Sequence, residues 1–358
     1  MKQNMVLMVC VCILLLALLC FPSEMLLTSS ESFSLWFSTV LPSLFPFMTA
    51  CGILFRLGVA QFLGHFLQPI MKPLFGLSGV CAFPLVTGFL SGYPMGAKTT
   101  AMLYENNQIS ISEAQKILCF CNNPGPLFVI GTVGTGFFGN PKVGYLFLFS
   151  IFGGAILAGI CCRFFKSTPL AVPYHPHIAK QPFSLILSDC VSDALLTVAQ
   201  IGGYLVFFSV FTKALTLFGV FDFLAKIFSF CSLSDTFLTG LCSGILEMTN
   251  GTYQLSTTVE PFWLKGCFCV GLLCFGGFSI LGQTWSVCGK LPISIVKYIF
   301  AKILHILFAS LLFLLVCPFV FLDIQKAVPV FALHTATAFS PLFAIFSFCL
   351  MLITHSAK

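Results

Sequence analysis

Two charged side chains stand in apolar sequence, where a charge is costly. Lys98 ends the segment Gly88–Lys98, and Glu247 is flanked by Leu246 and Met248. A charge inside a membrane span costs about 3 kcal/mol or more, so such a residue is usually paired or functional. Lys98 could pair with Glu247 or reach the membrane interface, and Glu247 could instead carry a coupling proton. These two residues are the first candidates for holding an anion and for moving a proton.

Segments rich in helix breakers accompany these charges. Gly88, Gly92 and Gly96 are spaced by four with Pro94 among them, and Asn122-Asn123-Pro124-Gly125-Pro126 interrupts another apolar run. The glycine spacing suits close helix packing, whereas the prolines and the two amides favour segments that line a site. In hydrocarbon, broken backbone survives only where it is buried in protein or lines a water-filled cavity. Packing and site lining both stay open for Gly88–Lys98, and the adjacent amides favour a site.

The candidate substrate-binding residues come from these segments and from similar ones later in the chain. They are Ser91, Gly92, Tyr93, Lys98, Asn122, Asn123, Glu247, Thr249, Asn250 and Gln283. No catalytic residue is predicted, because the sequence has no Ser–His–Asp order, zinc signature or phosphate loop. We therefore expect neither an enzyme nor a cofactor, and no metal site, since the Cys pairs lack zinc-ligand spacing.

The composition places these residues in a membrane protein. Of the 358 residues, 58% are hydrophobic and 8% are charged, and the mean hydropathy is +1.03. A soluble domain carries about 25% charged residues, so only a lipid-solvated protein tolerates this composition. The net charge of +6 comes from scattered basic residues, which excludes a nucleic-acid footprint. Most of the 18 cysteines lie in apolar runs, where they act as small hydrophobes rather than as a disulfide framework.

The sequence predicts an all-α, polytopic fold with broken or re-entrant helices. Met5–Phe21 is expected to be an uncleaved first span rather than a signal peptide, because no A-x-A-like site follows it. Leu26–Ser34 is expected to be a loop, and Val59–Leu77 and Thr212–Phe230 are expected to be amphipathic segments at the interface. A helix is expected to start at Ser110, because Ser110-Ile111-Ser112-Glu113 has the spacing of a capping box.

The second half of the chain repeats the plan of the first. Each half reads as a span, an amphipathic segment, a Gly-rich break, a polar loop, a second broken span and a plain span. Gly88 and Asn122 are 34 positions apart, as are Gly244 and Phe278. Paired breaks at matching positions predict a transporter with two inverted repeats and a site where the breaks meet. Half-helix N-termini at such a site can hold an anion.

The expected boundaries follow from this repeat. They are 1–33 for a first membrane helix and loop, 34–165 for repeat 1, 166–184 for a polar linker, 185–322 for repeat 2, and 323–358 for a C-terminal segment with a short apolar helix. The expected partners are the lipid bilayer and a small-molecule anion, without nucleic acid. The membrane orientation and the oligomeric state, a homo-oligomer included, stay open.

Three motifs resemble one known family. They are Leu41-Pro42-Ser43-Leu44-Phe45-Pro46-Phe47, Ser91-Gly92-Tyr93-Pro94-Met95-Gly96-Ala97-Lys98 and Asn122-Asn123-Pro124-Gly125-Pro126-Leu127-Phe128, and the turn Gly139-Asn140-Pro141 accompanies them. With these motifs the chain resembles the YlbJ family of sporulation integral membrane proteins, also called SpoVV. The resemblance covers most of the chain and is strongest over residues 35 to 160. The family is similar to the nucleoside-recognition or Gate group and, distantly, to concentrative nucleoside transporters.

The resemblance implies a role in endospore formation. The family is linked to moving dipicolinic acid out of the mother cell across the outer forespore membrane. Dipicolinate is a small planar dianion, which suits a site of half-helix N-termini, Asn amides and Lys98. The residues by themselves support only a carrier of small anions. A nucleoside or another small metabolite stays open as the substrate, as does a non-transporting protein that assembles a sporulation complex.

Overall fold

The computed structural model describes residues 2–164, 181–228, 233–289 and 291–321. All regular structure in these ranges is helical. Five helical segments of the described residues are long and apolar enough to cross a membrane, or six if the bent pair Val59–Phe75 and Gly79–Ser91 counts as one span. The five are Pro22–Arg56, Pro141–Cys162, Phe183–Leu217, Phe262–Val287 and Ile295–Val320. The chain is therefore an all-α, multi-pass membrane protein, as predicted.

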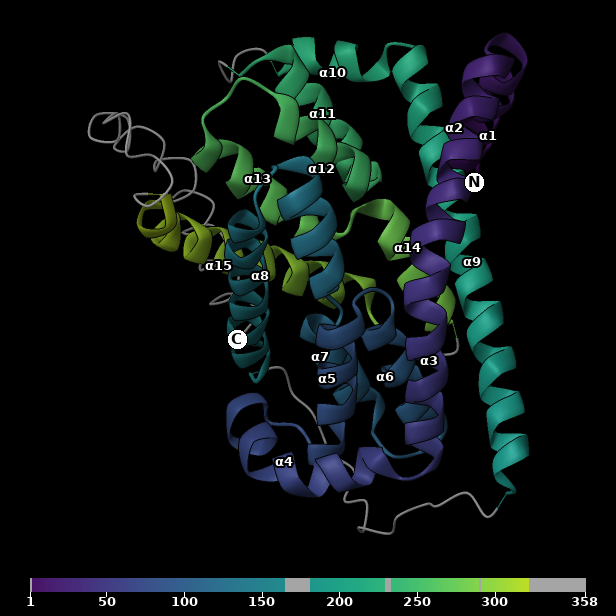
Figure 1. Cartoon of the computed structure of the whole chain (residues 1–358), viewed down its shortest axis with the longest axis vertical. Helices are drawn as coiled ribbons and strands as arrows, with labels where there is room; N and C mark the ends of the chain where they lie inside the picture. The colour runs from purple at the N-terminus through teal and green to yellow at the C-terminus, as the bar shows by residue number, and fades with distance from the viewer. Residues whose placement is uncertain (1, 165–180, 229–232, 290, 322–358) are drawn as a thin grey trace. The chain divides into compact units, whose positions relative to one another are not determined.

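The first half of the chain contains four longer helices and several short ones. In chain order they are α1 (Lys2–Cys20), α2 (Pro22–Leu35), the π-helical η1 (Trp36–Val40), α3 (Leu41–Arg56), α4 (Val59–Phe75), the 3-10 turn η2 (Gly79–Cys81), α5 (Ala82–Ser91), α6 (Met95–Glu105), α7 (Ile111–Cys121), the π-helical η3 (Phe128–Phe137) and α8 (Pro141–Cys162). Figure 1 shows α4 lying across the end of α5, and the two segments meet at 90°.

The second half has an order of elements similar to that from α3 to α8 in the first half. It consists of α9 (Phe183–Leu217), α10 (Val220–Ile227), α11 (Asp235–Leu246), α12 (Met248–Thr257), α13 (Phe262–Phe275), α14 (Gly277–Val287) and α15 (Ile295–Phe321). A long helix, an amphipathic helix, two interrupted helix pairs and a final long helix follow one another from α3 to α8 and from α9 to α15, but the amphipathic helix has 17 residues in α4 and only eight in α10. The inverted orientation of the two halves stays a prediction.

The structure divides into a large and a small unit. Residues 1–313 form one compact unit, and residues 314–358 form the other, of which only the helical stretch to Phe321 is described. All contacts discussed below lie within the first unit. The predicted linker 166–184 is described from residue 181 onward, and the predicted C-terminal segment 323–358 lies outside the described residues.

Two expectations about the membrane helices are wrong. The stretch Leu26–Ser34 is helical rather than a loop, because Pro22 starts α2 at its first turn and no glycine or proline follows before Leu35. The helix α9 continues through Thr212 to Leu217, and Gly219, with a φ of 68°, is the residue that ends it. The amphipathic segment of the second half is therefore only the eight-residue α10.

The apolar part of the first helix is shorter than the predicted span. The helix α1 ends at Cys20, one residue before the predicted end at Phe21, and its apolar part, Met8–Cys20, is shorter than the five helical segments that could cross a membrane. The chain turns at Phe21, which has a φ of −131° and leaves the helical region. The long helix that follows, Pro22–Arg56, packs beside α9, and Figure 1 shows α3 and α9 running side by side.

Close glycine contacts hold the interrupted helices together. A Cβ atom at Gly88 or Gly96 would collide with the backbone carbonyl of Cys121 in α7. In the second half, a Cβ atom at Gly251 would collide with the Cα atom of Gly244. Glycine lets the backbones approach at these points, as it does in many membrane helix pairs. The glycine spacing around Gly88 therefore does serve packing.

Carboxylates fix the starts of corresponding helices in both halves. The predicted capping box at α7 is present, with Ser110 and Glu113 bonded to each other's backbone amides, and Glu113 also accepts from the amide of Ser78 at 2.9 Å. In the second half, Glu260 accepts from the amide of Ser234, the N-cap of α11, at 3.0 Å. Burial raises the pKa of Glu260, but the hydrogen bonds that it accepts from Ser234 have the opposite effect. The pKa of Glu260 therefore lies below its usual value.

Candidate functional site

The first break separates α5 from α6. The chain turns at Gly92, whose φ of 92° lies in the left-handed region that favours glycine. A Cβ atom at Gly92 would collide with the backbone of Gly125, so the first break lies directly against the second. The hydroxyl of Tyr93 lies 3.0 Å from the carbonyl oxygen of Cys274, in α13. The first break is therefore held by both halves of the chain.

The second break lies between α7 and η3 and contains the two predicted asparagines. Asn122 Nδ2 donates to Thr284 Oγ1 of α14 at 2.9 Å, and Asn123 Nδ2 donates to the carbonyl oxygen of Phe120 at 2.8 Å. Both side chains are fully buried. Their amide oxygens have no hydrogen-bond partner among the described residues, which is uncommon for buried acceptors. The pair thus connects the two halves and leaves two acceptors unused.

The third break is the single residue Glu247, between α11 and α12. Its carboxylate accepts hydrogen bonds from the backbone amides of Thr249 at 3.0 Å and of Asn250 at 2.8 Å, and its side chain is 3% exposed. A helix N-terminus presents unpaired amides and a partial positive charge. Glu247 therefore fills the anion-binding end of α12 with its own carboxylate.

The fourth break lies between α13 and α14. Gly276 and Gly277 have φ values of 82° and 73°, which glycine adopts without strain. In the helix that follows, Ser279 and Gln283 lie four positions apart on one face, and Gln283 Nε2 donates to Ser279 Oγ at 3.4 Å. Both side chains are buried.

The four breaks meet at one cavity of about 340 Å³, which we call the break cavity. Its polar lining from the four breaks consists of Ser91 and Tyr93, Glu247 and Thr249, and Ser279 and Gln283, with Pro124 and Gly125 from the second break. The Ser91 hydroxyl has no hydrogen-bond partner among the described residues. Glu247 is the single charged side chain of the described lining. The predicted meeting of the four breaks is therefore present in the structure.

Five of the ten candidate residues line this cavity, and the other five do not. Ser91, Tyr93, Glu247, Thr249 and Gln283 line it. Gly92, Asn122 and Asn123 are buried in the packing of the breaks, and Asn250 donates its backbone amide to the Glu247 carboxylate. Lys98 lies in a different cavity. The candidate set thus divides into cavity-lining residues, supporting residues and one residue elsewhere.

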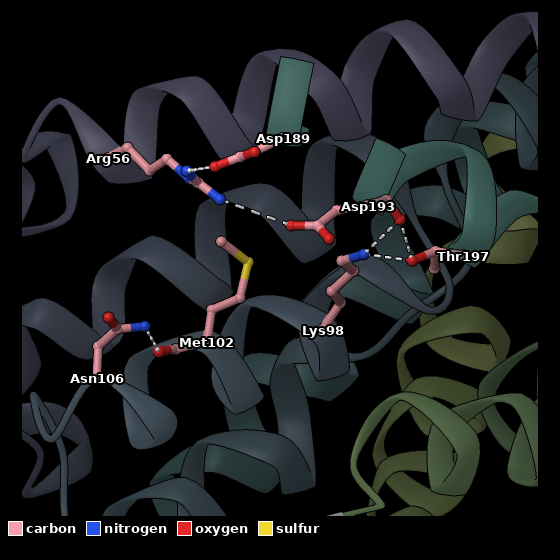
Figure 2. A network of polar contacts seen from close by, with 7 residues as sticks. All are labelled: Arg56, Lys98, Met102, Asn106, Asp189, Asp193 and Thr197. Atoms are coloured by element: carbon pink, nitrogen blue, oxygen red, sulfur yellow. Dashed lines mark hydrogen bonds and ion pairs between the residues drawn. The ribbon is translucent and has the colours of Figure 1, made fainter. Parts of the chain in front are cut away.

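Lys98 lies in a second cavity of about 400 Å³, which we call the charged cavity. Lys98 Nζ donates to the carbonyl oxygen of Asp193 at 3.2 Å and to the Thr197 hydroxyl (Figure 2). Arg56 forms ion pairs with Asp189 at 2.7 Å and with Asp193 at 3.8 Å. In the described part of the chain, no carboxylate lies within ion-pair distance of Lys98. The predicted pair of Lys98 and Glu247 is therefore not formed, and the two residues line different cavities.

Lys302 is a buried cation next to the first two breaks and is absent from the residues predicted to bind substrate. Its side chain is 1% exposed, and its Nζ donates to the carbonyl oxygen of Asn122 at 2.6 Å and to the Tyr93 hydroxyl at 3.2 Å. The rings of Tyr93 and Tyr298 lie 5.1 and 5.7 Å from the same atom. No ion pair of Lys302 is present among the described residues. A lysine inside an apolar helix is the signal that could have identified it.

The described residues contain no cluster of three or more His, Cys, Asp or Glu side chains that could hold a metal ion. The polar groups of the break cavity are hydroxyls, amides, helix ends and one carboxylate. Such groups bind and orient a small polar molecule through hydrogen bonds.

Comparison with known proteins gives two matches. Residues 37–160 match the Gate family, described as nucleoside recognition. The "Sporulation integral membrane protein YlbJ" of Bacillus subtilis (strain 168) is 31% identical over 310 residues, which cover 80% of this chain and 76% of that protein. No solved structure matches the chain. The Gate match spans the first two breaks, Gly92 and Asn122–Pro126.

Proposed function

Because the chain belongs to the family of the sporulation integral membrane protein YlbJ, we propose that it is a membrane carrier that moves a small organic anion during sporulation. The substrate we propose is dipicolinate, which the mother cell would export across the outer forespore membrane. In this proposal the protein binds and moves its substrate without chemically changing it.

The meeting of four helix breaks at one cavity is the observation that carries the proposal. Interrupted helices leave backbone amides and carbonyls free, and membrane proteins tolerate them where they line a cavity. Paired breaks at matching positions of two halves are typical of carriers that bind substrate near the middle of the membrane. A volume of about 340 Å³ suits a small organic molecule.

Glu247 supports an anionic substrate. Its carboxylate accepts two amide hydrogen bonds at the N-terminus of α12, so this helix end already holds a carboxylate. A substrate carboxylate offers the same chemistry. We propose that Glu247 takes up a proton and leaves these amides when substrate binds, so that one carboxylate replaces the other and one proton moves with the substrate. Tyr93 is the other titratable group of the described lining.

The repeated order of elements supports movement between two states. In carriers with inverted repeats, one repeat moves against the other around a fixed site, which then opens to alternate sides of the membrane. We propose that the two halves of this chain are related in this way. The break cavity lies between them, since α5 and η3 contribute to it from the first half and α12 and α14 from the second.

A nucleoside is the second candidate substrate. Glu247 is the single charged group of the described lining, and a carboxylate with neighbouring amide and hydroxyl groups can accept hydrogen bonds from ribose hydroxyls. The Gate description, nucleoside recognition, fits this alternative. The two substrates make opposite demands on Glu247, because a nucleoside needs this carboxylate whereas an anion must displace it.

Equilibrium binding to the purified protein distinguishes the two substrates. We expect labelled dipicolinate to bind saturably and more tightly at pH 6 than at pH 8, because protonation removes the competing carboxylate of Glu247. In Glu247→Gln, dipicolinate should bind at least as tightly as in the wild type and without this pH dependence. Glu31→Gln, at an exposed position of α2, is the matched control and should behave as the wild type.

A different result identifies the alternative. Displacement of the label by unlabelled nucleosides, together with loss of binding in Glu247→Gln, would contradict the anion proposal and support nucleoside transport. Absence of saturable binding for either substrate would contradict both and leave a non-transporting membrane protein of sporulation.

A further inference from the structure

The two cavities follow one another along the same helices. On α3, Ser43, Leu44 and Phe47 line the break cavity, and Met48, Gly52 and Arg56 line the charged cavity. Phe47 and Met48 are neighbours in the chain, about 1.5 Å apart along a helix. The boundary between the cavities therefore crosses α3 at these two residues.

The same boundary crosses two further parts of the chain. On α9, Ile201 and Leu205 line the break cavity, whereas Asp193, Thr197 and Gln200 line the charged cavity. Near the first break, Tyr93 lines the break cavity, whereas Met95 and Lys98 of α6 line the charged cavity. Three separate segments thus contribute neighbouring residues to both cavities.

Apolar side chains occupy this boundary. Met48 of α3 and Met95 of α6 line the charged cavity on this side, and with Val198 of α9 they belong to one apolar cluster; the three are 3%, 1% and 0% exposed. We call these three residues the apolar layer. Methionine is flexible and adapts to changing surroundings, so two methionines can separate two cavities in one state and move apart in another.

The charged cavity contains an exposed carboxylate. The Asp193 side chain is 66% exposed, whereas that of its partner Arg56 is 27% exposed. The contact between Arg56 and Asp193 is loose at 3.8 Å, in contrast to the 2.7 Å contact with Asp189. Lys98 is bonded to a carbonyl and a hydroxyl instead of a carboxylate, as Figure 2 shows. Lys98 can therefore accept an anionic partner, and Arg56 can exchange Asp193 for one.

We propose that the charged cavity is a second carboxylate-binding site on the substrate pathway. An anion from water binds between Lys98 and Arg56, replaces Asp193 on Arg56, and reaches the break cavity when the apolar layer opens. Two carboxylates at suitable separation use both cations, so the site favours dicarboxylates over monocarboxylates. This inference rests on the proposed transport function, but the position of the apolar layer can be tested without a substrate.

Thiol labelling in sealed vesicles tests the layer. Thr197→Cys lies in the charged cavity and Thr249→Cys in the break cavity, and peptide mass spectrometry follows each site separately from the native cysteines. The probe is a charged, membrane-impermeant methanethiosulfonate. We expect Thr197→Cys to react from one face of the membrane only, and Thr249→Cys to react from that face at least about ten times more slowly. Adding Met48→Ala and Met95→Ala should remove most of this difference. Equal labelling of both sites without these changes would contradict the layer.

Transport kinetics test the second site. Lys98→Gln should raise the KM for dipicolinate about tenfold, as expected for one lost charged contact, with a much smaller change in maximal rate. Lys98→Arg should keep a KM near the wild-type value. Lys297→Gln, at an exposed lysine of α15, is the control and should leave both parameters unchanged. An unchanged KM in Lys98→Gln would overturn the second site.

The two possible failures are distinct. If wild-type protein does not transport dipicolinate, the proposed function fails, and the labelling result still decides whether an apolar layer separates the cavities. If the wild type transports dipicolinate and Lys98→Gln transports it with the same KM, only the second site fails.

Discussion

Glu247 and Lys302 carry opposite charges at the same set of breaks and are satisfied in different ways. Backbone amides hold the Glu247 carboxylate, whereas a carbonyl, a hydroxyl and two aromatic rings surround the Lys302 ammonium. Burying a charge without an ion-pair partner costs several kcal/mol even after relaxation. An apolar side chain at this position would not carry this cost, so stability alone does not account for Lys302. An anion that visits the breaks would benefit from this charge.

Lys302→Met should therefore separate stability from transport. We expect the unfolding temperature in detergent to equal or exceed the wild-type value, because the buried ammonium is removed. Anion transport per folded protein should fall at least about tenfold, since the neighbouring cation is lost. Thermal melts and vesicle flux measure the two effects. Lys297→Met, at an exposed position of the same helix, is the control. A lowered unfolding temperature with full transport would show that Lys302 is structural.

The unusual charged residues are predictable from the sequence, whereas their partners are not. Glu247 was recognised because its neighbours are apolar, but its capping role depends on where α11 ends, which the sequence did not show. Lys98 was recognised as an unusual charge, yet its contacts come from α9, which lies about a hundred residues later in the chain. Such long-range contacts depend on how helices pack, and one sequence carries little information about that.

At the scale of elements, the interrupted helices depend on glycine at their contacts. Gly251 of α12 lies against Gly244 of α11, and a Cβ atom there would collide with the Cα atom of Gly244. Backbone cannot move aside as a side chain can, so a larger residue must push the two helices apart. Because Glu247 lies between these helices, such a shift would also disturb the break cavity.

Gly251→Ala should lower stability, and Gly203→Ala should not. Overpacking of this kind typically costs about 1–3 kcal/mol, whereas a Cβ atom at Gly203 in α9 would meet no other atom within 4 Å. Alanine also favours helix over glycine by up to about 1 kcal/mol, so Gly203→Ala should be neutral or stabilising. Thermal unfolding in the same detergent compares the variants. Equal unfolding temperatures for both would contradict the tight contact.

The breaks and the capping box were predictable because local chemistry determines them. Glycines with positive φ at positions 92, 276 and 277 and the Ser110–Glu113 box lie where the sequence indicated. The helix at Leu26–Ser34 was missed because polar side chains suggested a loop, although no residue there breaks a helix. The length of α9 was missed for a related reason, since Lys213 and the threonines near it changed the polarity but not the backbone.

At the scale of the whole molecule, the account describes one pathway through the membrane unit of residues 1–313. In the proposed pathway, the break cavity would hold substrate among four interrupted helices, the charged cavity would receive it from water, and the apolar layer would separate the two. The membrane class was predictable from composition alone, because so few charges exclude a water-soluble surface. The arrangement of cavities was not, since it depends on which segments of the two halves face one another.

Flux of labelled dipicolinate into proteoliposomes measures proton-coupled anion transport itself. We expect saturable uptake by the wild-type protein above protein-free liposomes, driven by an inwardly directed proton gradient. Glu247→Gln should bind dipicolinate but lose this response to the gradient, because no proton moves at that position. Uptake equal to that of protein-free liposomes, by protein that is folded and correctly inserted, would contradict proton-coupled dipicolinate transport.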